Sequence, residues 1–192
     1  MGKNVSTKRQ PVYPGPEALR RTAGAVIPLY RKIASDGAYA RRWTRAVRTL
    51  DLGRMIRLFE ETRPIGRLGL ATNGIGFFVT VPFPAPLQEY TNGTSIPPGT
   101  TQFRFGTKAN RTIAAAVLPL YRTIRDCPPF ASALSAAIRR RNLRRVRELV
   151  HSRVRSRFLR DVTLIESGFA MEFRIPGDKF PYLNEFFREF NG

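Results

Sequence analysis

Histidine and cysteine are nearly absent from this chain, which has one of each among its 192 residues. The single Cys127 excludes an intramolecular disulfide. With the lone His151 it leaves too few ligands for a zinc site, so we expect no metal ion. His151 follows Glu148 by three residues, a spacing that acid–base chemistry can use. We favour a solvated histidine near a helix C-terminus, where the helix dipole stabilises the charged imidazole.

Long apolar segments are also missing. No stretch approaches the roughly 20 apolar residues that a membrane-spanning helix needs. The chain begins MGKNVSTKRQPVYPGPE, a polar segment interrupted by proline and unlike the apolar core of a signal peptide. We therefore expect a cytoplasmic protein without a membrane span.

The short motifs of common catalytic and cofactor sites are absent from the sequence. It has neither a phosphate-binding loop ending in Gly-Lys-Ser/Thr nor a dinucleotide-binding fingerprint. Glu60 and Glu61 stand apart from other acids, which gives poor support to a metal-dependent nuclease. Cys127 has no histidine nearby in sequence to activate it as a nucleophile. We predict that the protein is not an enzyme and uses no cofactor.

Acidic residues are scarce relative to basic ones, 14 against 33, so the formal net charge is +19. A folded chain of this charge repels itself, and a polyanionic partner relieves that repulsion. A GC-rich genome also favours arginine codons, and this alternative stays open. The hydrophobic fraction of 42% is that of a globular protein and argues against disorder.

The two halves of the chain match one another at an offset of 91 residues. Residues 25–33 read AVIPLYRKI, and residues 116–124 read AVLPLYRTI. The match continues with apolar residues opposite apolar ones, and the second half has one extra residue before the strands. Asn92 then aligns with Asn184. We interpret the match as an internal duplication of one unit.

Each half predicts three helices followed by antiparallel strands, so the fold class is α+β. In the first helix Val26, Leu29, Tyr30 and Ile33 recur at helical spacing, as do their counterparts 91 residues later. Pro28 and Pro119 occupy matching places within it, and we expect a kink or a fresh turn there. The later helices are expected to begin after N-cap residues, namely Asp36, Asp51, Asp126 and Asn142.

After the predicted helices, apolar residues recur at every second position, which indicates strands. Asn73-Gly74 is a strong hairpin signal, because both turn positions tolerate positive φ. The expected hairpin strands are Arg67–Thr72 and Ile75–Val81, and in the second half Asp161–Ile165 and Gly168–Ile175, joined through Glu166-Ser167. We expect a third strand at Thr101–Gly106, after a loop rich in proline and glycine at Gln88–Gly99.

The predicted organisation is a flexible basic arm at residues 1–15, a first repeat lobe at 16–106 and a second at 107–192. We expect two pseudo-symmetric lobes packed as one compact unit, with strands that can join in one antiparallel sheet.

Arginines are concentrated between positions 139 and 160, where ten occur. Guanidinium groups suit phosphates, carboxylates and sulfates, and nucleic acid is the commonest such partner. The candidate nucleic-acid-binding residues are Arg139, Arg140, Arg141, Arg144, Arg145, Arg147, Arg153, Arg155 and Arg157, with Arg41, Arg42 and Arg45 on the related helix of the first half.

Two hypotheses follow for the function. The first is a non-enzymatic protein that binds the nucleic-acid backbone or another polyanion without strong sequence preference, because no base-reading motif is visible. The second is a self-assembling structural protein, such as a spore-coat, capsid or filament subunit. Its support is the N-terminal arm, the potentially open strand edges and the C-terminal cluster Phe186-Phe187-Arg188-Glu189-Phe190, through which a homo-oligomer would form.

Overall fold

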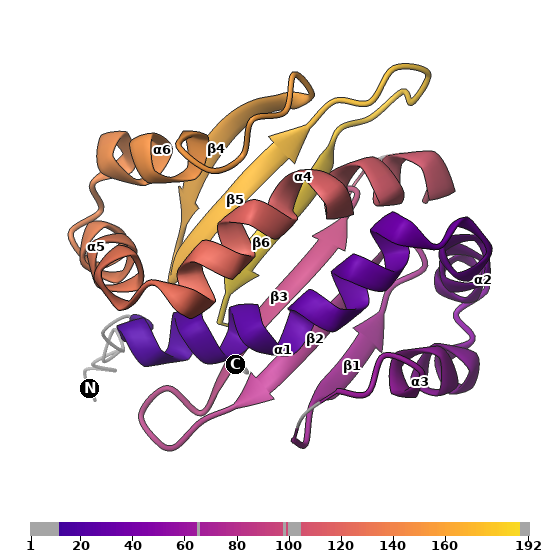
Figure 1. The fold of residues 1–192 in the computed structure, drawn as a ribbon, viewed down its shortest axis with the longest axis horizontal. Helices are drawn as coiled ribbons and strands as arrows, with labels where there is room; N and C mark the ends of the chain where they lie inside the picture. Colours follow the sequence, from indigo (N-terminus) through magenta and orange to yellow (C-terminus); the bar gives the residue numbers. More distant parts are fainter. Residues whose placement is uncertain (1–11, 65, 98, 100–104, 189–192) are drawn as a thin grey trace, which may run out of the picture.

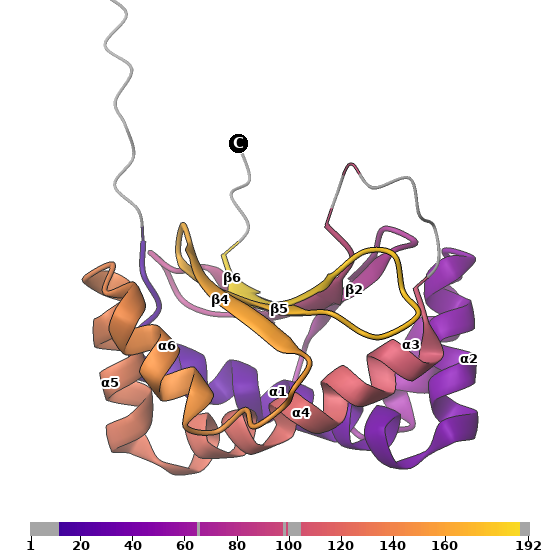
Figure 2. The same cartoon turned by 90° about the horizontal axis from the view of Figure 1, so that it is seen from above.

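The computed structural model describes residues 12–64, 66–97, 99 and 105–188. Within these residues the chain forms six α-helices and one six-stranded antiparallel sheet, an α+β fold. The helices lie on one face of the sheet, with α1 and α4 beneath its centre and the shorter helices at the two ends (Figures 1 and 2). Among the described residues, none of the helices has both the length and the apolar character needed to cross a membrane.

The elements follow the same order in the two halves of the chain. The first half contains α1 (Pro16–Ser35), α2 (Gly37–Arg48), α3 (Leu52–Glu60), β1 (Gly69–Thr72), β2 (Gly76–Pro82) and β3 (Glu89–Ser95). The second half contains α4 (Thr107–Asp126), α5 (Pro128–Arg139), α6 (Leu143–His151), β4 (Leu159–Ile165), β5 (Gly168–Phe173) and β6 (Tyr182–Phe187).

Three of the predicted N-caps are confirmed. The side chains of Asp36, Asp51 and Asn142 each accept a hydrogen bond from the backbone N–H three residues later, at 2.9, 2.8 and 3.0 Å. Each bond satisfies one of the donors that a helix start leaves without an intrahelical partner. At the start of α5 the N-cap is Cys127 rather than the predicted Asp126, and it makes no side-chain cap bond.

The core lies between the sheet and the helix layer, with α1 and α4 side by side (Figure 1). Tyr30 of α1 and Tyr121 of α4 are fully buried, and their rings meet edge to face with centroids 5.2 Å apart. Trp43 of α2 is also buried and packs edge-on against Phe77 of β2. Pro28 and Pro119 lie inside α1 and α4, which both continue past the proline.

The sheet has the strand order β1-β2-β3-β6-β5-β4, so strands of both halves form one sheet. The halves meet where β3 pairs with β6 and Gly93 lies opposite Glu185. The two predicted hairpins are confirmed as the pairs β1–β2 and β4–β5. Gly74 takes a φ of 82° in the first turn, a conformation that glycine adopts without a steric penalty.

The prediction for the third strand is wrong in its position. The strand β3 is Glu89–Ser95, inside the segment expected to be a loop. Of the expected strand, residues 101–104 lie outside the described residues, and Phe105 and Gly106 belong to no strand. The sequence of β3, EYTNGTS, has one apolar residue, and its buried Asn92 and Thr94 bond to side chains of other elements. Its composition therefore resembles that of a turn.

A hydrogen-bonded network of buried polar side chains joins the sheet centre to the two long helices. Asn184 of β6 donates to Tyr30 Oη and to Thr94 Oγ1, both at 2.9 Å, and its Oδ1 accepts from Tyr121 Oη at 2.6 Å. Asn92 of β3 donates to Tyr121 Oη at 2.8 Å. Burial of these groups is tolerated because each bond replaces one to water.

Candidate functional site

The ten arginines between positions 139 and 160 are all exposed. They lie at the end of α5, on α6, in the segment that follows and at the start of β4. These elements form one end of the molecule (Figures 1 and 2). On α6 the arginines avoid the stripe of Val146, Leu149 and Val150, which is buried. The fold therefore places the predicted arginines of the second half at one end of the molecule, and their exposed side chains are hereafter called the α5–α6 surface.

Three of these arginines are paired with acids. Arg144 and Arg145 both bind Glu148, at 3.1 and 3.0 Å, and Arg147 binds Asp161 at 2.7 Å. The hydrogen bonds from Arg145 and Arg144 hold the pKa of the Glu148 carboxyl below its ordinary value. These pairs are exposed, so they contribute little to stability.

Three further arginines contact the protein without an acidic partner. Arg141 donates from Nη1 to the backbone carbonyl of Ile165 at 2.8 Å. The guanidinium groups of Arg153 and Arg157 lie over the rings of Phe130 and Phe158. The remaining four make no hydrogen bond or ion pair within the described part of the chain, and they are Arg139, Arg140, Arg155 and Arg160.

The candidates of the first half lie at the opposite end of the molecule, on α2 (Figure 1). Arg42 donates to both carboxylate oxygens of Glu61, at 3.1 Å each. Arg41 and Arg45 are exposed and form no ion pair with the described residues. The structure therefore divides the predicted residues between two separate surfaces.

Sequence reasoning missed the basic side chains between these two ends. Arg21 and Arg31 of α1 and Lys108 and Arg122 of α4 are exposed on helices whose other side packs on the sheet. Arg21 lies over the ring of Phe83, and the four exposed side chains show that basic residues also occur between the two ends of the helix layer. The match between the halves could have indicated these residues, because Arg31 aligns with Arg122 at the offset of 91.

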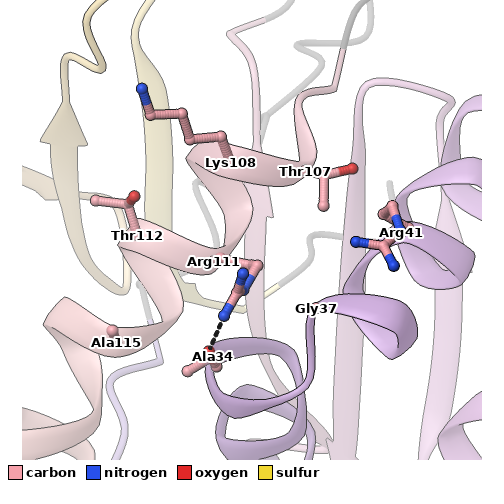
Figure 3. A pocket seen from close by; sticks show the side chains of 8 residues that line it. All are labelled: Ala34, Gly37, Arg41, Thr107, Lys108, Arg111, Thr112 and Ala115. Carbon is pink, nitrogen blue, oxygen red and sulfur yellow. Dashed lines mark hydrogen bonds between the residues drawn. The ribbon is translucent and has the colours of Figure 1, made fainter.

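A pocket of about 560 Å³ lies between the start of α2 and the start of α4 (Figure 3). Arg41, Lys108 and Arg111 bring three positive charges to it. Arg111 donates from Nη2 to the backbone carbonyl of Ala34 at 3.1 Å. Its remaining lining residues are Ala34, Gly37, Thr107, Thr112 and Ala115. Of the basic residues in this pocket, only Arg41 was among the predicted candidates.

The opposite face of the sheet carries no helix in the described part of the chain (Figure 2). Phe78 of β2 and Phe187 of β6 meet edge to face there, with ring centroids 6.0 Å apart. They line a second pocket of about 390 Å³ with Leu183 and Glu185. Burial raises the pKa of the Glu185 carboxyl above its ordinary value. This pocket therefore combines half-buried apolar side chains with a carboxyl group.

The C-terminal phenylalanine cluster divides between the two faces of the sheet. Phe186 is fully buried in the core, where its ring contacts Tyr90, Tyr121 and Phe169. Phe187 lies on the open face, and Phe190 lies outside the described residues. Phe186 therefore serves the folded core rather than a docking surface.

The residues considered for catalysis are not assembled into a site. His151 is exposed at the last position of α6, and Cys127 is a half-buried free thiol before α5. Within residues 12–64, 66–97, 99 and 105–188, no group of three or more His, Cys, Asp or Glu side chains is placed to hold a metal ion.

Comparisons with protein-family models, with curated proteins and with solved structures found no match to this chain.

Proposed function

We propose that the protein binds a polyanion, most favourably the phosphate backbone of a nucleic acid, through its helix layer. The α5–α6 surface makes the main contacts, and the basic residues of α2 make weaker ones. Binding has little sequence preference, since phosphate contacts carry no base information. The protein performs no catalytic step, and its setting is cytoplasmic.

The observation that carries this proposal is the unpaired charge of the α5–α6 surface. Of its ten arginines, only Arg144, Arg145 and Arg147 have an acidic partner among the described residues. Like charges at this density repel one another, and approach of a polyanion removes that repulsion. Guanidinium groups donate two parallel hydrogen bonds to a phosphate, which makes them well suited to the backbone.

We further infer that the chain is a duplicated unit folded as two pseudo-symmetric lobes. The three helices of each half have equal lengths, 20, 12 and 9 residues. One interhelical contact also recurs at the offset of 91. Arg20 of α1 donates to the Arg125 carbonyl at the end of α4, and Arg111 of α4 donates to the Ala34 carbonyl at the end of α1.

The test is a binding titration with nuclease-treated protein at low salt, using labelled duplex DNA, single-stranded DNA and RNA. Replacing the four unpartnered arginines with glutamine should weaken binding by about tenfold or more, because each lost phosphate contact also loses its counterion release. This α5–α6 variant carries Arg139→Gln, Arg140→Gln, Arg155→Gln and Arg160→Gln.

A variant at the other end of the molecule controls for total charge. Arg45, Arg48, Arg54 and Arg57 lie on α2 and α3 and form no ion pair with the described residues. Their replacement by glutamine removes the same charge and should weaken binding less. Absence of binding by the unmodified protein to all three nucleic acids would refute the proposal.

The second candidate function is self-assembly as a structural subunit, which the open sheet face favours. Phe78, Leu183 and Phe187 give this face an apolar patch without a helix over it in the described residues. Apolar patches of this kind commonly mark contact surfaces. Light scattering after size exclusion, with and without nuclease, separates the two functions. A defined oligomer that survives nuclease treatment and is lost on Phe78→Ser would favour assembly.

A further inference from the structure

The pocket between α2 and α4 holds more positive charge than its own structure neutralises. Arg41, Lys108 and Arg111 line it, and no acidic residue of the described chain does (Figure 3). Arg41 and Lys108 are exposed and make no hydrogen bond or ion pair with the described residues. Arg111 is engaged on one side only, by the Ala34 carbonyl. Its other guanidinium nitrogens make no hydrogen bond to the residues that the structure describes.

The two guanidinium groups converge on one point of the chain. At Gly37, the position that a Cβ would take lies 3.2 Å from Arg111 Nη1 and 3.6 Å from Arg41 Nη1. Two cations that approach the same point repel each other unless an anion lies between them. Glycine at this position places no side chain between the two guanidinium groups. The convergence is therefore a second indication of a ligand, beyond the number of charges.

The start of α4 borders the same pocket. Its N-cap, Gly106, provides no side-chain cap, so backbone N–H groups of the first turn have no partner from a cap. Thr107 and Lys108, in that turn, line the pocket. The N-terminus of a long helix favours anions through both these donors and its dipole.

The matching place in the other half lacks this charge. Positions 91 residues away hold Glu17 in place of Lys108 and Ser132 in place of Arg41. There Glu17 binds Arg20, the counterpart of Arg111, at 3.0 Å. Arg20 nevertheless makes the same kind of bond to a helix-end carbonyl. Of these two places in the described chain, the pocket at α2 and α4 is the one that combines the contact with unneutralised charge.

We propose that this pocket binds a phosphate group carried by a small phosphorylated ligand or by the end of a nucleic acid. Arg41 and Arg111 bind the phosphate oxygens near Gly37, and Lys108 adds a positive charge at the rim of the pocket. This site does not depend on the α5–α6 surface.

The test is calorimetric titration of the protein with inorganic pyrophosphate at low salt. Arg41→Gln with Lys108→Gln should weaken the affinity by about tenfold or more, because each substitution removes a charge-assisted contact. Arg31→Gln with Arg122→Gln is the matched control. It removes equal charge from the same helix layer and should leave the affinity within about twofold, since these residues do not line the pocket. Melting temperatures establish that both variants fold.

A dinucleotide with and without a 5′-phosphate identifies the source of the phosphate. Tighter binding of the phosphorylated form assigns a nucleic-acid end, and binding of pyrophosphate alone assigns a small ligand. Retention of pyrophosphate binding by the α5–α6 variant separates this site from the nucleic-acid surface. Lack of pyrophosphate binding, or equal affinity in the pocket variant and its control, would overturn the proposal.

Discussion

At the scale of single residues, Trp43 is the largest side chain fully enclosed by the core. Trp43→Ala should lower the free energy of unfolding by about 3–5 kcal/mol, the cost of truncating a large core aromatic. Trp43→Phe should cost less, because the indole Nε1 has no hydrogen-bond partner in the described residues and its removal breaks no bond. Urea unfolding of both variants measures the difference. Equal losses would contradict this packing.

The buried tyrosines make the stability dependent on alkaline pH. Burial raises the pKa of Tyr30 from 10.0 to about 12, and it also raises the pKa of Tyr90 and Tyr121. The folded chain therefore keeps protons that the unfolded chain loses above pH 10.0. This contribution to stability is complete below pH 10.0 and is lost as the pH rises through about 12. Tyrosinate absorbance and circular dichroism, followed together, should change together. Ionisation of these tyrosines near pH 10 in a folded protein would show that they are not enclosed.

At the scale of elements, the helices and hairpins could be predicted because local signals agreed in both halves. The caps at Asp51 and Asn142 and the turn at Asn73-Gly74 each act within a few residues. The strand β3 could not be predicted from local signals, because its buried polar side chains bond to residues that are distant in sequence. Burial of Asn92 and Thr94 in the core is tolerated because they form hydrogen bonds with Tyr121 and Asn184 of other elements.

The candidate site was predictable to a similar extent. The density of arginines at positions 139–160 is visible in the sequence, but their pairing is not. Arg147 pairs with Asp161 because α6 packs beside β4. The pocket partners of Arg41 lie on α4, far along the chain. Only the folded chain brings them together.

The pairing of β5 with β6 gives a test at the same scale. A Cβ at Gly168 would overlap the backbone carbonyl oxygen of Phe186. Gly168→Ala should therefore destabilise the protein by about 1–3 kcal/mol or more, because a backbone atom cannot move aside without disturbing the strand pair. Gly53→Ala, on the exposed side of α3, meets only side-chain atoms at 3.7 Å and should be neutral or stabilising. Thermal unfolding of the two variants checks this contrast, which equal melting temperatures would contradict.

At the scale of the whole molecule, the helix layer and the open face of the sheet carry different side chains. The helix layer presents basic side chains from α2 to α6, and the open face of the sheet presents Phe78, Leu183 and Phe187. This division allows the two faces to bind different partners. A polyanion on the helix layer would leave the sheet face free for a second contact.

The central claim is that unpaired arginines of the α5–α6 surface bind phosphates, and the salt dependence of DNA binding tests it most directly. The slope of log K against log salt should approach about −0.9 for each phosphate neutralised on duplex DNA. In the α5–α6 variant the slope should be shallower by about two to four, with a smaller change in the charge-matched α2–α3 variant. Equal slopes in these two variants, or tight binding that ignores salt, would contradict the claim.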